Sequence, residues 1–233
     1  MFTHSPVKKL LLCCALLALL LGLCCASALA EESGTCGTLS WTLSDDGILT
    51  ISGTGEMENF DYCTTDAWRG HRSAIKKVTI QNGVMSIGEC AFNGCSSLSS
   101  ITIPESVTGI GNCVFWRCGS LSSVTIPDSV TRIGDGAFYG CGSLSSVTIP
   151  ASVTSIGCDA FRNCDSLTSA TILNPDCVIG NSDYDVFLRA ASGFVLHGWT
   201  GSTAEIYAAS ADGVTFESLG AFDSNAANVF YNK

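Results

Sequence analysis

The sequence repeats itself with a period of 23 residues. Residues 118–140 read CGSLSSVTIPDSVTRIGDGAFYG, and residues 141–163 read CGSLSSVTIPASVTSIGCDAFRN. Aligned on this period, the chain gives four near-complete units and a fifth that degenerates; they start at Arg72, Cys95, Cys118, Cys141 and Cys164. A fixed period in the twenties with an L-x-x-V-x-I core is typical of a solenoid in which each coil carries one short strand.

We call residues that are equivalent in successive units a column. The apolar columns hold one kind of side chain each: leucine, β-branched residues or phenylalanine. Examples are Leu98, Leu121 and Leu144; Val78, Ile101, Val124 and Val147; and Phe92, Phe115, Phe138 and Phe161. One coil cannot bury these side chains alone, whereas stacked coils can, so like residues should form continuous internal ladders. The sequence therefore predicts a curved solenoid of the α/β type, mostly β.

Within the third unit, the strand is expected at Ser122–Ile126. Pro127 ends it, because proline lacks the N–H that a ladder needs. The residues Asp128-Ser129 make a turn. The segment DGAFYG, residues 135–140, is expected to form a short helical turn with Phe138 pointing inward.

The repeat motif resembles that of the BspA-like leucine-rich repeat family. The matching pattern, C-x-S-L-x-S-[VI]-T-I-P-x-S-V-T-x-I-G-x-x-[AV]-F-x-x-C, runs from Cys95 to Cys164. Residues 34–57 resemble the N-terminal cap of such proteins, and NPDCVIG and GSTAEIYAASADGVTFESL resemble their closing segment. The resemblance implies a right-handed solenoid, secretion or display on a cell surface, and adhesion to host matrix or other cells.

Both ends of the stack need caps, because a terminal coil leaves an apolar face and a strand edge exposed. At the front, alternation around the turn at Asp45-Asp46-Gly47 predicts a β-hairpin. At the back, a strand at 194–197 precedes a capping box, Ser202-x-x-Glu205, a short helix and a last strand. The predicted organisation is a signal peptide (1–30), an N-terminal hairpin cap (31–71), about five repeats (72–190), a C-terminal cap (191–220) and a tail (221–233).

The first 30 residues have the pattern of a secretory signal. Lys8 and Lys9 precede an uncharged run that ends in Ala28-Leu29-Ala30, which predicts cleavage after Ala30. The alternative is a retained membrane anchor, because the run is nearly long enough to span a bilayer.

Cleavage leaves nine basic and 21 acidic residues, a formal net charge of −12. This balance argues against nucleic acid or an anionic membrane as partner. We expect a secreted or surface-exposed protein with no membrane insertion after cleavage.

Ten cysteines remain after cleavage, and most follow the repeat. Cys95, Cys118, Cys141 and Cys164 should stack about one strand spacing (~4.8 Å) apart, as a ladder of buried thiols or as bridged pairs. We favour buried thiols, because bridging one pair would break the identity of the coils. Cys90 and Cys113 form a second column with the same two alternatives. Cys36 and Cys63, both in the front cap, are the best candidates for a disulfide.

The sequence offers no assembly for catalysis, cofactors or metals. No G-x-S-x-G occurs, and the serines have no partnering histidine in the repeat. His71 and His197, the histidines outside the signal, are more than a hundred positions apart. A line of stacked sulfurs does not give the tetrahedron that zinc prefers. We therefore predict a non-enzyme without metal or cofactor.

Two surfaces are candidates for binding. The strand residues between the buried ones point outward and form a neutral strip of hydroxyls on the concave face. This concave strip comprises Ser100, Thr102, Ser123, Thr125, Ser146, Thr148 and Thr171. On the opposite, turn-bearing side, four large residues vary between repeats and form a convex rim: Trp116, Arg117, Tyr139 and Arg162. The simplest explanation of the strip is β-propensity and solubility.

Three functions fit these features. The first is recognition or adhesion by a monomer that binds a protein or glycan of a cell surface or host matrix. The second is a structural spacer without a ligand of its own. The third, ice or crystal binding by the hydroxyl strip, requires a flat array, whereas this repeat is expected to curve.

Overall fold

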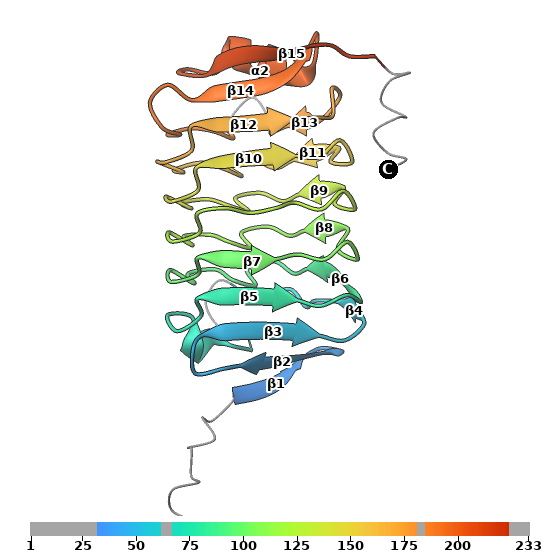
Figure 1. Ribbon diagram of the computed structural model, residues 1–233, viewed down its shortest axis with the longest axis vertical. Helices are drawn as coiled ribbons and strands as arrows, with labels where there is room; N and C mark the ends of the chain where they lie inside the picture. Colours follow the sequence, from blue (N-terminus) through green and yellow to red (C-terminus); the bar gives the residue numbers. More distant parts are fainter. Residues whose placement is uncertain (1–31, 62–66, 181–184, 224–233) are drawn as a thin grey trace, which may run out of the picture.

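In the computed structural model, the coils stack into one column (Figure 1). The structure describes residues 32–61, 67–180 and 185–223, so the predicted signal segment lies outside it. Strand β1 (Glu32–Cys36) lies at one end of the stack and β15 (Thr215–Ala221) at the other. Among the described residues, no helix is long and apolar enough to cross a membrane. The predicted β-rich solenoid is confirmed.

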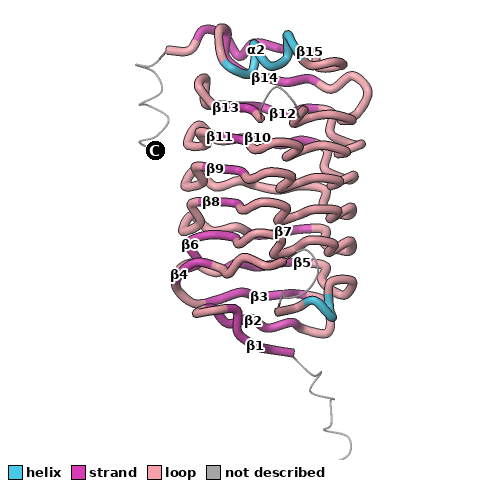
Figure 2. The backbone as a smooth tube through the Cα atoms, turned by 180° about the vertical axis from the view of Figure 1, so that it is seen from behind, coloured by secondary structure: helices cyan, strands magenta, loops and turns pink. Residues whose placement is uncertain are grey.

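The described strands form three sheets. Two of them share one face, with strand orders β1-β2-β3-β5-β7 and β10-β12-β14-β15. The third lies on another side and has the order β13-β11-β9-β8-β6-β4 (Figure 2). The remaining strands of the first face are β2 (Leu39–Leu43), β3 (Ile48–Ser52), β5 (Lys77–Ile80), β7 (Ser100–Thr102), β10 (Ser146–Ile149), β12 (Ser169–Ile172) and β14 (Val195–Thr200). Those of the third sheet are β4 (Gly55–Glu56), β6 (Val84–Ile87), β8 (Gly109–Ile110), β9 (Arg132–Ile133), β11 (Ser155–Ile156) and β13 (Val178–Ile179).

Successive coils pair in the register that the 23-residue period requires. In the parallel pair β5–β7, Lys77 lies opposite Ser100, and in β10–β12, Ser146 lies opposite Ser169. The short strands of the third sheet do the same, as Ile110 opposite Ile133 shows. Because side chains alternate along a strand, this register keeps every buried column inside.

The phenylalanine column is the centre of the core. Phe92, Phe115, Phe138 and Phe161 are fully buried. Their rings stack one on the next, with centroid distances of 5.6, 5.0 and 5.0 Å. The stack continues at both ends, since Trp68 lies 5.7 Å from Phe92 and Phe187 lies 5.6 Å from Phe161. The predicted ladder is therefore present and is longer than the repeat motif.

The helical turn predicted at residues 135–140 is wrong. The segment forms consecutive turns, and its counterpart in the preceding coil shows why. The backbone N–H groups of Cys113, Phe115 and Arg117 donate to carbonyl oxygens of the next coil, at 2.7–2.8 Å. Because alternate amides bond across the stack rather than along their own chain, the i→i−4 bonds of a helix cannot form. The inward position of Phe138 is confirmed.

The strand predicted at Ser122–Ile126 is also wrong. This segment pairs as a strand with neither neighbour, which divides the first face into two sheets. Its sequence, SSVTIP through Pro127, is identical to residues 145–150, which contain β10. The neighbours differ. β10 packs beside Ala170, which leaves room for Val147, whereas Val124 stands beside the larger Ile101 and both stay half-buried.

The front cap adds three strands to the first face, where the sequence predicted a hairpin of two, and β4 of the same cap belongs to the third sheet. β1 pairs with β2, and β2 with β3, all antiparallel. β3 also pairs in parallel with β5, so Leu49 and Ile51 extend the columns of Val78 and Ile80. Trp41 covers the end of the aromatic stack, with its ring 6.2 Å from that of Trp68. The cap is thus continuous with the solenoid; η1 (Arg69–His71), a single 3-10 turn, leads into the next coil.

The back cap follows the sequence closely. β14 and β15 extend the sheet in parallel, and α2 (Thr203–Ser210) connects them. The Ser202 hydroxyl accepts from the N–H of Glu205, and the Glu205 carboxylate accepts from the N–H of Gly201 at 2.6 Å. Gly213, just past the helix, has a φ of +76°. The predicted capping box is confirmed. Residues 224–233 of the predicted tail lie outside the described residues.

Candidate binding surfaces

Many of the repeated hydroxyls hold neighbouring coils together. In the motif P-x-S-V-T, the serine donates to a carbonyl oxygen of the preceding coil. The Oγ of Ser106, Ser129 and Ser152 lies 2.8, 2.6 and 2.7 Å from the carbonyl oxygens of Val84, Val107 and Val130. The threonines Thr108, Thr131 and Thr154 make the same kind of bond at 3.1–3.2 Å. The sequence analysis missed this function, although the invariance of S-V-T among the repeats signals it.

We expect Ser129→Ala to lower the free energy of unfolding by about 0.5–1.5 kcal/mol, because it removes the donor to the Val107 carbonyl oxygen. Urea unfolding followed by circular dichroism measures the change. Ser146→Ala is the matched control, since the Ser146 hydroxyl is exposed; its effect should stay within about 0.5 kcal/mol. Equal losses in the two variants would show that the hydroxyl bonds between coils add nothing to stability.

The concave strip lies where the sequence placed it. In register, Thr79 stands opposite Thr102 and Thr148 opposite Thr171. Five of its seven residues are exposed, and Ser100 and Thr171 are half-buried. None of the seven side chains makes a hydrogen bond within the part of the chain that the structure describes. In this respect the strip differs from the serines and threonines that bond coil to coil.

A shallow groove opens along the strip where strand pairing is interrupted. It has a volume of about 340 Å³. Ser123 and Thr125 line one side, Ser146 and Thr148 the other, and Asp128 lies at one end. The half-buried Val124 contributes apolar surface to the floor. The groove therefore combines unbonded hydroxyls with a small apolar area.

The strip continues into the back cap, which the sequence analysis did not foresee. His197 of β14 stands opposite Thr171 and thus occupies the threonine column. On β15, Glu217 stands opposite His197, and its carboxylate oxygen lies 3.6 Å from the His197 Nδ1. The 23-residue pattern hid both residues, because the equivalent positions Thr171, His197 and Glu217 are 26 and then 20 residues apart. The strip is neutral in its middle and ends in a titratable pair.

The convex rim divides into a rigid part and an exposed one. The rings of Trp116 and Tyr139 are stacked, with centroids 3.8 Å apart and an angle of 5° between the planes. The Tyr139 hydroxyl accepts from the side-chain amide of Asn163 at 2.7 Å, and Arg162 forms an ion pair with Asp159 at 3.1 Å. The Arg117 side chain is exposed. The structure thus brings two of the four predicted rim residues into direct contact.

Polar side chains form a further ladder on the turn side. The carboxamide oxygen of Asn112 accepts from the N–H of Asp135, and the carboxylate of Asp135 accepts from the N–H of Cys158, at 2.9 and 2.8 Å. Asn112 also donates to the Glu89 carboxylate at 3.0 Å. The side chains of Asn112 and Asp135 therefore fix the backbone of the turns, which makes them structural.

The thiol ladder is buried and hydrogen-bonded. The Sγ atoms of Cys118, Cys141 and Cys164 lie 3.1–3.2 Å from the carbonyl oxygens of Phe92, Phe115 and Phe138. Burial raises the pKa of Cys118 and Cys141 well above the usual range and that of Cys164 to about 12. Cys95 is fully buried in the same column. A thiol that keeps its proton and has no access to solvent is a poor nucleophile. Cys36 is buried, and Cys63 lies outside the described residues, so their disulfide stays a prediction.

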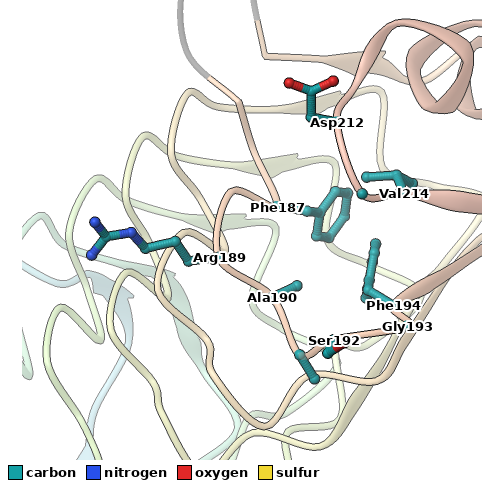
Figure 3. Close-up of a pocket in the computed structure, with 10 residues that line it drawn as sticks. Phe187, Arg189, Ala190, Ser192, Gly193, Phe194, Asp212 and Val214 are labelled. Atoms are coloured by element: carbon teal, nitrogen blue, oxygen red, sulfur yellow. The ribbon is translucent and has the colours of Figure 1, made fainter.

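A second hollow lies against the back cap (Figure 3). It has a volume of about 290 Å³, with Phe187 and Phe194 on its inner side and Asp212 and Val214 at its border. Arg189 belongs to the same loop, but its side chain points away from the hollow. Within the described residues, no three histidine, cysteine or acidic side chains gather as a metal site would require.

The chain was compared with known proteins. No curated protein matches the chain. Among solved structures, the chain is similar to a leucine-rich repeat protein from T. pallidum (24% identity, 70% of this chain and 92% of that one, TM-score 0.48). It is also similar to a leucine-rich cell surface protein from Faecalibacterium prausnitzii (24% identity, 75% and 56%, TM-score 0.45). Similarities at this level say nothing about a ligand.

The repeat region itself identifies the family. The BspA type leucine-rich repeat profile matches in six copies across residues 67–185, which is more than half of the chain. This range begins five residues before Arg72, the first residue of the sequence alignment. The chain belongs to the BspA-type leucine-rich repeat family.

Proposed function

We propose that the chain is a non-catalytic recognition protein that acts outside the cell and binds a protein or glycan of a cell surface or extracellular matrix. One observation carries the proposal: the hydroxyls of the concave strip, five of seven on exposed residues, make no hydrogen bond within the described residues. Serine and threonine elsewhere in the same repeat bond to the preceding coil. The fold therefore does not require hydroxyls in the strip.

The chemistry of the strip suits a neutral, hydroxyl- or amide-rich ligand. Hydroxyls both donate and accept hydrogen bonds, and their regular spacing of about 4.8 Å along the stack allows many bonds at once. Aromatic and arginine side chains, which dominate tight interfaces, do not occur among the seven residues. A single molecule should therefore bind weakly, and many copies on one surface should bind firmly through avidity.

A solid-phase binding screen tests this proposal. The protein from residue 31 onward is measured against immobilised matrix proteins, mucins and neutral glycans, alone and as a multivalent display. We expect at least one of these ligands to bind. The variant Ser123→Lys/Ser146→Lys should bind it about tenfold or more weakly, because the lysine side chains cover the groove. Lysine is tolerated in this column, where Lys77 already stands.

The control variant carries the same charge change away from the strip. Gln81 and Asn82 are exposed in the loop after β5, so Gln81→Lys/Asn82→Lys should bind like the unmodified protein. If the multivalent display binds no member of the panel, the protein is better explained as a structural spacer without a ligand. Equal loss in both variants would mean that charge, and not the strip, governs binding.

A further inference from the structure

Two arginines on the turn side occupy a position that favours glycine. The residues Gly94, Arg117, Gly140, Asn163 and Arg189 form one column, and all five have a φ between +58° and +75°. In this left-handed region the Cβ of any other residue crowds the following carbonyl oxygen. Glycine has no Cβ and adopts the conformation without strain. Arg117 and Arg189, both with φ of +60°, therefore strain the backbone.

The described part of the chain shows no side-chain bond of either arginine that would offset this strain. Asn163, in the same column, donates to the Tyr139 hydroxyl, and asparagine tolerates the left-handed region better than most residues. The side chains of Arg117 and Arg189, by contrast, are exposed and make no hydrogen bond or ion pair within residues 32–61, 67–180 and 185–223. Strained residues without a structural function tend to mark functional sites.

The surroundings of the two arginines suit a ligand. Gly140 lies beside Arg117, since a Cβ at Gly140 would be 3.5 Å from the Arg117 side chain, an ordinary contact. The stacked rings of Trp116 and Tyr139 stand in the neighbouring column and give the edge a rigid aromatic element. Arg189 stands three coil steps from Arg117, about 14 Å along the stack, and points into solvent (Figure 3).

We propose that Arg117 and Arg189, together with the Trp116–Tyr139 stack, form a docking site for an acidic segment of a partner protein. Guanidinium groups bind carboxylates with two parallel hydrogen bonds. Tryptophan, tyrosine and arginine are the residues that most often dominate protein–protein interfaces. In a chain with a formal net charge of −10, two exposed cations that make no ion pair are complementary to an acidic ligand. This inference rests on the proposed recognition function and names a second surface for it.

Replacing both arginines by glycine separates function from stability. Arg117→Gly/Arg189→Gly introduces the residue that Gly94 and Gly140 already have in this column, so we expect the thermal midpoint to rise, by about 2–4 °C per substitution. The same variant should bind a fluorescent decapeptide of alternating glutamate and tyrosine at least tenfold more weakly in an anisotropy titration. Raising the salt from 50 to 300 mM should weaken binding by the unmodified protein, because part of the attraction is between charges.

Arg132→Ser is the matched control for charge. Arg132 is exposed on β9, in the third sheet, and the equivalent residue of the next coil is Ser155, so the variant should keep both affinity and midpoint. A decapeptide with lysine in place of glutamate should not bind. The proposal is overturned if the decapeptide does not bind the unmodified protein, if Arg132→Ser weakens binding as much as the glycine pair, or if heparin fragments bind more tightly than the peptide. The lysine variants of the concave strip are measured with other ligands, and none of these outcomes changes their result. The failure of the docking site can therefore be distinguished from the failure of the proposed function.

Discussion

Replacing Phe138 by alanine is expected to lower the free energy of unfolding by about 3–5 kcal/mol. The ring is fully buried and stacks on both neighbours, with centroids 5.0 Å from those of Phe115 and Phe161. Alanine would leave a cavity that the ladder cannot close, because the strands and turns on all sides fix the spacing of the coils. The free energy of unfolding of a domain is only about 5–15 kcal/mol, so the variant loses a large part of its stability.

Urea unfolding of the Phe138→Ala protein measures this loss. Tyr139→Leu is a suitable control: Tyr139 is the next residue and also stacks on a ring, but it is half-buried at the surface. Because a solenoid is stabilised by contacts between neighbouring coils, the Phe138 substitution should also broaden the transition as the two halves separate. A loss below 1 kcal/mol would show that the aromatic stack is not the core.

Alkaline pH is expected to unfold the protein through its thiol ladder. Burial raises the pKa of Cys118 and Cys141 well above the usual range, and that of Cys164 to about 12. The folded state thus holds these protons more tightly than the unfolded state does, whose thiols titrate near pH 8.5. The stabilisation is complete below that pH and is lost as the pH rises toward the folded pKa values. Three such thiols together lose about 4 kcal/mol per pH unit.

Urea unfolding at pH 7, 9 and 10 with a reducing agent tests this dependence. We expect the midpoint to change little up to pH 8 and to fall steeply between pH 9 and 10, before most lysines and tyrosines titrate. The triple variant Cys118→Ser/Cys141→Ser/Cys164→Ser keeps a donor for each carbonyl and removes these three thiols, while Cys36, Cys90 and Cys177, whose pKa is also raised by burial, remain. Its stability should be lower at pH 7 and should fall less steeply up to pH 10. If the free energy of unfolding falls with pH at the same rate in both proteins, the thiol ladder is not the cause of the pH dependence.

The sequence predicted the parts of the fold that one coil repeats in the next. The leucine and phenylalanine columns and the register of the strands follow directly from the 23-residue period, because identical side chains must meet in successive coils. The capping box at Ser202 was equally readable, since its bonds lie within four residues of the chain.

The errors arose where the neighbouring coil decides the local structure. The turns around Phe115 look like a helix in the sequence, but their N–H groups bond to the next coil. Residues 122–127 and 145–150 have one sequence and two conformations, which only the packing beside Ile101 or Ala170 distinguishes.

The candidate sites were visible in the sequence to different degrees. Alternation along the strands located the concave strip. Arg189 was not found, because three additional residues precede it and shift it out of the period. Its equivalence with Arg117 emerged from the shared positive φ and not from the alignment. Side chains in a regular position can thus be predicted, whereas those displaced by an insertion cannot.

The spacing of the coils is the claim on which every surface described above depends, and distances between spin labels test it most directly. Nitroxide labels are placed in pairs on one exposed column, as Ser146→Cys/Ser169→Cys, Ser123→Cys/Ser169→Cys and Ser100→Cys/Ser169→Cys. The half-buried Cys158 is first replaced by serine, because the buried thiols should not react. We predict distances that grow by about 4.8 Å per coil across the series. Distances that do not increase in equal steps would contradict the stacking of the coils in register.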